Sequence, residues 1–146
     1  MTIIKGSIWR GKFASDVIVK VLNVSEEFNA VSAKVRLHDL NDAKMSYVLT
    51  TFEHYYEFTD MAETRVIFKK DSDNEVVAFL LDVPSNYGNV VCYSHVGQHG
   101  EASLDYARGC KPANKQEYFN LAMELQNRGY YLDVKKKFPS GFVQGE

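Results

Sequence analysis

Short apolar segments separated by polar turns predict four β-strands in the first 60 residues, at residues 3–9, 16–24, 31–38 and 45–52. Residues 31–38 alternate strictly between apolar and polar side chains, which is typical of a strand with one buried face. Both faces of residues 16–24 are largely apolar, which indicates a strand buried on both sides. Because no helical pattern interrupts these strands, we expect an antiparallel sheet that closes into a small barrel.

The second half of the chain has a different pattern. Residues 65–70 and 75–83 predict a hairpin with a polar turn of Asp, Ser and Asn, and residues 90–95 predict a third strand. A helical pattern covers residues 114–128, and a last strand is predicted over 130–138. This order predicts a β-β-β-α-β antiparallel sheet with one helix.

The fold class predicted for the whole chain is therefore α+β. We expect an N-terminal antiparallel SH3-like barrel in residues 1–60 and an α+β subdomain in residues 61–146. Asn114 is the expected cap of the helix, Glu117 completes a capping box, and Gly129 suits a left-handed residue after the last turn. The predicted buried stripe of this helix comprises Tyr118, Leu121, Ala122 and Leu125.

Composition narrows the class of protein. The chain is 45% apolar and 25% charged, as in a globular protein, and its formal net charge is −2. This charge argues against a protein that binds nucleic acid through bulk positive charge. Neither a membrane span nor a signal-peptide layout is visible, so we expect a cytoplasmic protein with no membrane partner, in which the two cysteines are free.

About 18 residues separate the third strand of the second half from the helix, and this connection is rich in polar side chains and glycines. Structureless connections of this length are uncommon in compact domains unless they bind something. We also expect Ser103 to cap a short helical turn that Gly109 ends. The alternative is a polar loop folded on itself, with its histidines bound to main-chain groups. The predicted ligand- or partner-binding residues are Tyr93, His95, Gln98, His99, Ser103, Asp105 and Arg108.

Two kinds of chemistry were weighed for this loop. Its candidate zinc ligands are Cys92, His95, His99 and Cys110. Their spacing matches no familiar zinc finger, and a regular strand would point Cys92 and His95 to opposite faces. We therefore predict no bound metal and no cofactor, and we interpret Cys92 as a small buried thiol. A cysteine, a histidine and Asp105 are the residue types of a Cys-His-acid nucleophilic site. Closeness in the sequence does not provide the geometry that such catalysis requires, so we assign no catalytic residue.

Basic residues give a further hypothesis. The first strands are enriched in cations, and with Trp9 and Phe13 nearby they form a candidate surface for a strand of nucleic acid. The cations concerned are Lys5, Arg10, Lys12 and Lys20. Residues 135–137 are three lysines in a row, which we interpret as a solvated edge.

Residues 65–138 resemble a group of uncharacterised small proteins from bacteriophages and prophages. The resemblance rests on Tyr-x-His-Val-Gly-Gln-His at residues 93–99 and on a later series of short matches. These are Pro112-Ala113, Glu117-Tyr118, Leu121, Glu124-Leu125 and Gly129-Tyr130-Tyr131-Leu132. Where the group has Thr-Pro at the helix start, this chain has Asn114-Lys115. The first 60 residues are similar to small phage SH3-like barrels.

The resemblance implies an origin in a phage or mobile element, and therefore the cytoplasm of a host cell. The small size and the lack of a convincing catalytic set favour a non-enzymatic protein that engages a host factor, such as an anti-defence (for example anti-CRISPR) inhibitor. The alternatives are a protein that sequesters a nucleotide or second messenger through the loop, and a nucleic-acid-binding module in the N-terminal half. The oligomeric state is left open.

Overall fold

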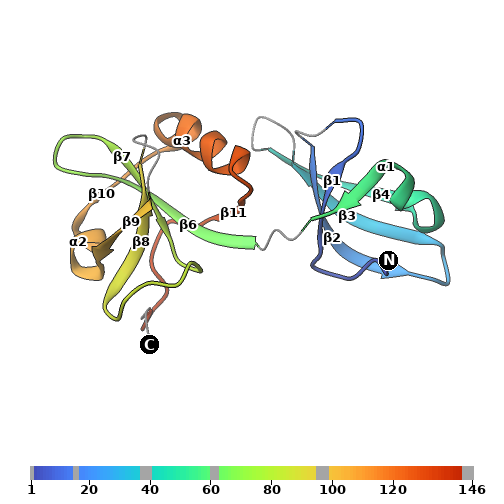
Figure 1. The fold of residues 1–146 in the computed structure, drawn as a ribbon, viewed down its shortest axis with the longest axis horizontal. Helices are drawn as coiled ribbons and strands as arrows, with labels where there is room; N and C mark the ends of the chain where they lie inside the picture. The colour runs from blue at the N-terminus through green and yellow to red at the C-terminus, as the bar shows by residue number, and fades with distance from the viewer. Residues whose placement is uncertain (1, 15–16, 37–40, 60–62, 95–98, 143–146) are drawn as a thin grey trace. The chain divides into compact units, whose positions relative to one another are not determined.

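The structure, a computed structural model, describes residues 2–14, 17–36, 41–59, 63–94 and 99–142. The chain forms two compact units, Met1–Ala62 and Glu63–Glu146, and each contains its own β-sheet (Figure 1). The protein is thus mostly β, with short helices, and belongs to the α+β class. No helix in the described ranges is long and apolar enough to cross a membrane.

The N-terminal unit contains a five-stranded antiparallel sheet with the strand order β4-β3-β2-β1-β5. A single 3₁₀ turn, η1 (Leu49–Thr51), and the short helix α1 (Phe52–Tyr55) connect β4 to β5. The strands are β1 (Ile8–Gly11), β2 (Ile18–Ser25), β3 (Ala30–Arg36), β4 (Asp42–Val48) and β5 (Tyr56–Phe58).

The core of this unit follows the predicted alternation. Val31, Ala33 and Val35 of β3 are buried together with apolar residues of β2. Trp9 is 2% exposed, packs edge-on against Phe52 of α1 at 5.3 Å between ring centroids, and donates its indole N–H to Ser7 at 2.9 Å. The two rings therefore fix the short helix against the sheet.

Three N-terminal predictions were wrong: where the first strand begins, where the fourth strand ends, and the absence of a helix. The first strand begins at Ile8, because Ile4 accepts the main-chain N–H of Ser7 and Gly6 has a left-handed φ of +86°, which together form a turn. The fourth strand ends at Val48. The short helix α1 follows before β5, because burial of Phe52 stabilises a helical turn that the sequence pattern only weakly favours. Among the described pairings, β4 and β5 are the two edges and do not join, so no closed barrel is observed.

The C-terminal unit contains a six-stranded sheet with the path β10-β6-β7-β8-β9, and β11 pairs with β6. Two helices accompany it, α2 (Leu104–Gly109) and α3 (Lys115–Asn127). The strands are β6 (Glu63–Lys70), β7 (Val76–Leu80), β8 (Asn89–Tyr93), β9 (His99–Ser103), β10 (Lys111–Pro112) and β11 (Tyr131–Val134).

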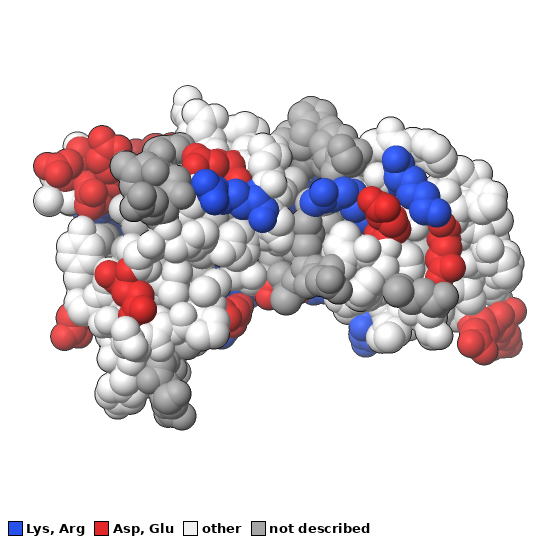
Figure 2. All heavy atoms as spheres, in the orientation of Figure 1, with Lys and Arg blue, Asp and Glu red and all other residues white. Residues whose placement is uncertain are grey.

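The predicted hairpin of β6 and β7 is confirmed. Asp71 closes its turn by accepting the main-chain N–H groups of Asp73 and Glu75 at 2.9 and 3.0 Å, and Asn74 has the left-handed φ of +62° that such turns favour. Acidic side chains gather over this turn, at the left end of the molecule in Figure 2.

The β-β-β-α-β prediction was wrong in two respects. The predicted long loop contains β9, α2 and β10, and the last strand runs parallel to β6. Strand β9 escaped notice because residues 99–103 carry a single apolar side chain and form an edge, where alternation is weak. Ser103 does cap α2 as predicted, accepting the N–H of Tyr106 at 3.1 Å.

The two helices cover opposite faces of the sheet (Figure 1). On one face, Tyr118 of α3 stacks on Phe68 of β6, with ring centroids 4.3 Å apart and an interplanar angle of 11°. On the other face, Leu104 and Ala107 of α2 pack with Phe79 of β7. The predicted capping box of Asn114 and Glu117 begins α3 and is confirmed.

Candidate functional site

A groove of about 1,060 Å³ lies beside the edge of β6 that pairs with both β10 and β11. The other edge of β6 is occupied by β7, whereas this edge pairs with β11 at residues 63–66 and with β10 at residues 69–70. The chain leaves the sheet after β11 and again after β10, and the groove opens between these two exits. Six cations line it and define what we call the basic groove: Lys69, Arg108, Lys115, Lys135, Lys136 and Lys137.

Lys69 lies deepest among these cations, because its side chain is buried and the residue is only 8% exposed. Its Nζ donates to the main-chain oxygen of Arg108 at 3.2 Å and lies 5.5 Å from the ring centroid of Phe138. Burial lowers the pKa of Lys69 below its usual 10.5; the Arg108 charge lowers it further, while Cys110 opposes this effect. The hydrogen-bond partner of the ammonium is a neutral main-chain oxygen, and burial together with the neighbouring Arg108 charge disfavours the charged form.

Arg108 comes from the last turn of α2. Its guanidinium lies 5.9 Å from the ring centroid of Phe138, and its Nη2 donates to the main-chain oxygen of Phe142 at 3.3 Å. Lys115 begins α3, directly after its cap residue. Two separate segments thus bring positive charge to the same wall of the groove.

The other wall is the chain that follows β11. Lys135 keeps the sheet pairing for one more residue through a main-chain bond to Val66 at 2.8 Å, and its Nζ lies 3.2 Å from Asp133. Lys136 and Lys137 are exposed, and neither is ion-paired with a described residue. These two ammonium groups are available to a ligand.

Glu117 is the one carboxylate among the described residues that line the groove, and its charge is already engaged. One oxygen accepts the Asn114 N–H at 3.0 Å, and the other lies 2.8 Å from the Nζ of Lys70. The hydrogen bond from the main-chain N–H of Asn114 has the largest effect, and together with Lys70 it holds the pKa of Glu117 below its usual 4.5. The net charge of the groove is therefore positive.

The predicted residues Tyr93 and His99 meet on the α3 face of the sheet, away from the basic groove. Tyr93 is fully buried and donates its hydroxyl to Glu124 of α3, and burial, with this hydrogen bond, raises the pKa of Tyr93. The His99 ring lies 4.9 Å from that of Tyr93, and its Nε2 lies 2.9 Å from the Tyr130 hydroxyl. The Tyr93–Glu124 contact joins β8 to α3, and the His99–Tyr130 contact joins β9 to the segment between α3 and β11.

The remaining predicted loop residues lie elsewhere. Ser103 and Asp105 begin α2 and line a second cavity of about 510 Å³, together with Arg108, which also reaches the basic groove. His95 and Gln98 lie outside the described residues. The described part of the loop therefore distributes its polar side chains between separate places.

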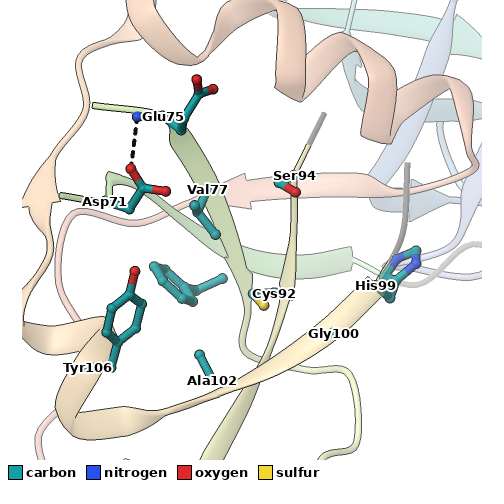
Figure 3. A pocket seen from close by; sticks show the side chains of 10 residues that line it. Asp71, Glu75, Val77, Cys92, Ser94, His99, Gly100, Ala102 and Tyr106 are labelled. Atoms are coloured by element: carbon teal, nitrogen blue, oxygen red, sulfur yellow. Dashed lines mark hydrogen bonds between the residues drawn. The ribbon is translucent and has the colours of Figure 1, made fainter. Parts of the chain in front are cut away.

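Cys92 lines a third cavity, of about 560 Å³, on the α2 face (Figure 3). His99 and Tyr106 lie at opposite ends of this cavity, with Cys92 between them. Burial raises the pKa of the Cys92 thiol above its usual 9.0, so the thiol stays protonated at neutral pH. Cys92 and Cys110 are both free thiols, and no three histidine, cysteine or acidic residues are grouped for a metal among those the structure describes.

The N-terminal surface proposed for nucleic acid lacks one of its aromatic residues. Trp9 is buried in the core, because its side chain packs between β1 and α1, so its ring is not available for stacking on a base. Phe13 is 85% exposed. The expectation for Trp9 was therefore wrong.

Sequence reasoning missed the basic groove because its cations are far apart along the chain. Lys69 reads as an ordinary alternating residue of a strand, and Lys115 as an exposed helix residue. The one available signal was the run of residues 135–137 followed by an aromatic residue, which we interpreted as a solvated edge. Comparison of the chain with protein-family models, with curated proteins and with solved structures found no match.

Proposed function

We propose that this protein is a non-enzymatic binding protein whose C-terminal unit holds a phosphate-bearing, nucleotide-like ligand in the basic groove. The observation that carries the proposal is the partly buried ammonium of Lys69, which has a main-chain oxygen as its hydrogen-bond partner and further cations lining the same groove. Burial disfavours the charge of an ammonium that has only a neutral hydrogen-bond partner, and ionisable groups with perturbed pKa values cluster at functional sites. A bound phosphate supplies the missing negative charge through charge-assisted hydrogen bonds.

The non-enzymatic part of the proposal is supported by the positions of the candidate catalytic residues. The Cys92 thiol is protonated at neutral pH, the His99 ring is engaged with Tyr130, and Asp105 belongs to the first turn of α2. Turnover of a nucleotide or peptide substrate that is abolished by His99→Ala would overturn this part.

The test is thermal unfolding and calorimetry with inorganic phosphate, pyrophosphate, nucleoside mono- and triphosphates and cyclic dinucleotides. A ligand that binds only the folded protein stabilises it by about 2.7 kcal/mol at a concentration of 100 times its Kd. We expect stabilisation by one or more of these compounds. A flat response to the whole panel would contradict the proposal.

The matched variants reverse exposed charges. Lys136→Glu and Lys137→Glu change the groove without touching the core, and Lys44→Glu makes the same change on exposed β4 of the N-terminal unit. We expect the groove variants to lose the ligand response and Lys44→Glu to keep it. An equal response in all three proteins would place the ligand elsewhere.

A second candidate function, the engagement of a host protein, is favoured by the surface of the N-terminal unit. Phe13 and Phe28 are 85% and 76% exposed, and Ile4 and Tyr55 are also exposed. Large exposed apolar side chains mark a protein-binding surface where they form one contiguous patch, which is what this second proposal requires of them. We propose that this unit is an SH3-like barrel, which its strand order and the short helix between β4 and β5 support.

In this second proposal the protein is of phage or prophage origin and acts on a factor in the host cytoplasm, as an anti-defence inhibitor does. The test is capture of partners from host lysate by the wild-type protein and by Phe13→Ser and Phe28→Ser. We expect a partner that the wild type retains and one of these variants loses. Identical recoveries from all three proteins would contradict a role for these side chains.

A further inference from the structure

We propose that the basic groove binds single-stranded nucleic acid, with successive phosphates along its walls and bases against its aromatic side chains. The inference rests on the proposed function and names its ligand class.

The first argument is the distribution of positive charge. The cations come from β6, from the end of α2, from the start of α3 and from the chain after β11, so four separate segments bring positive charge to the groove. One phosphate group cannot contact all of them. A chain of phosphates, in contrast, offers each cation a partner of its own.

The second argument is size. Pockets for drug-sized ligands have volumes of roughly 300–1,000 Å³, and the basic groove, at about 1,060 Å³, lies at the upper end of that range. Space therefore remains for a ligand longer than one nucleotide.

The third argument is the aromatic lining. Phe68 covers one face of the Tyr118 ring, which leaves the other face and the edge to line the groove. Phe138, in the chain that follows β11, also lines the groove and lies beside Lys69 and Arg108. Rings next to cations are how proteins hold unpaired strands, because every base has a face that can stack.

The formal net charge of −2 does not oppose this inference. Acidic side chains gather at the β6–β7 turn (Figure 2), whereas the described groove lining contains one carboxylate, Glu117, which is paired with Lys70. A nucleic acid in the groove contacts this positive lining, and phosphate contacts dominate the affinity of such complexes. The local charge of the groove therefore decides binding.

The experiment is fluorescence anisotropy with labelled oligothymidylates and oligouridylates of roughly 4 to 16 nucleotides, the range of site sizes known for strand-binding folds. Thymidine monophosphate, an abasic oligomer, a duplex and inorganic polyphosphate serve as competitors. We expect affinity to rise with oligomer length and then level off. We expect the abasic oligomer to bind about 5- to 150-fold more weakly, the loss that corresponds to one stacked base. The comparison of DNA with RNA identifies the preferred backbone.

Lys136→Glu should weaken binding and make the logarithmic salt dependence shallower by about 0.7, the contribution of one phosphate contact on a single strand. Lys44→Glu should change neither quantity. Tyr118→Phe keeps the ring and should bind as the wild type does, whereas Tyr118→Ala should bind more weakly while remaining folded by circular dichroism. If Tyr118→Ala does not fold, the abasic competitor alone decides the stacking argument.

Each failure has a distinct meaning. If thymidine monophosphate binds as tightly as every oligomer, the inference is overturned and the proposed function stands. If polyphosphate or duplex competes as well as the single strand, the groove is a general polyanion site and the inference is again overturned. If no phosphate compound binds, both proposals fall.

Discussion

The ammonium group of Lys69 lies 3.2 Å from the main-chain oxygen of Arg108, in the last turn of α2. The last carbonyl groups of a helix lack partners within the helix and carry partial negative charge, so a cation placed there is stabilised. One side chain of β6 therefore holds the end of α2 and forms the floor of the basic groove. Variants of Lys69 affect both stability and ligand binding.

Lys69→Met keeps the length of the side chain and removes its charge. We expect loss of the ligand response and a change in unfolding free energy within about 1 kcal/mol, because one hydrogen bond is lost while the cost of burying a charge is removed.

The lowered pKa of Lys69 also predicts how the stability of the wild type, relative to this variant, depends on pH. The folded-state pKa of Lys69 is lowered, so the unfolded chain binds more protons between that pKa and 10.5. The stability of the wild type relative to Lys69→Met should therefore rise with pH through this window. Urea unfolding of both proteins at about pH 7 and about pH 10 measures it. If the difference in unfolding free energy between the two proteins stays constant or falls as the pH rises, the pKa of Lys69 is not lowered in the folded protein.

Asn114→Ala removes the side chain that accepts the Glu117 N–H at 2.9 Å at the start of α3. Loss of a helix cap of this type costs about 1 kcal/mol, and we expect that loss in the unfolding free energy of the C-terminal unit. Gln116→Ala, on the exposed first turn of the same helix, is the control and should lie within about 0.5 kcal/mol of the wild type. Equal stabilities of the two variants would argue against the cap.

Tyr93→Phe removes the hydroxyl that donates to Glu124 of α3. Because hydrogen bonds to charged groups are worth about 1.5–3 kcal/mol and this ring is fully buried, we expect a destabilisation of about 2 kcal/mol. Tyr87→Phe alters an exposed tyrosine, so it should leave the midpoint of urea unfolding unchanged. The hypothesis fails if the two variants unfold at the same urea concentration.

Cys92 should react slowly with iodoacetamide at neutral pH, because burial raises its pKa above 9.0 and the thiolate is the reactive form. Cys110→Ser leaves Cys92 as the remaining cysteine, and its alkylation can be followed by mass spectrometry. The rate should increase on unfolding in urea and as the pH rises past 9. Fast alkylation of the native variant at neutral pH would show that the thiol is more exposed or more acidic than its surroundings indicate.

Local signals in the sequence predicted local structure well. The alternation at Val31, Ala33 and Val35 predicted a buried face, and the caps of α2 and α3 followed from Ser103 and Asn114. Each of these features depends on residues close together in the chain. Propensity and spacing therefore suffice to identify them.

Features that depend on distant segments were missed. Nothing in residues 131–134 says that they pair in parallel with β6, and nothing in Lys69 says that the end of α2 will lie over it. The basic groove depends on both the β6–β11 pairing and the position of α2 over Lys69. Its cations are therefore visible in the sequence, but their closeness in space could not be predicted from it. The predicted binding loop shows the same limit, since its described side chains make separate contacts that their spacing along the chain does not indicate.

The pairing of β6 with β11 also has a consequence for biosynthesis. Glu63 lies at the start of the second unit and pairs with Tyr131 near the end of the chain. During translation, this edge of β6 stays open until α3 and β11 have left the ribosome, whereas the N-terminal unit can complete its sheet earlier. A chain truncated after α3 would keep unpaired main-chain groups on β6, and such edges recruit other nascent chains into aggregates.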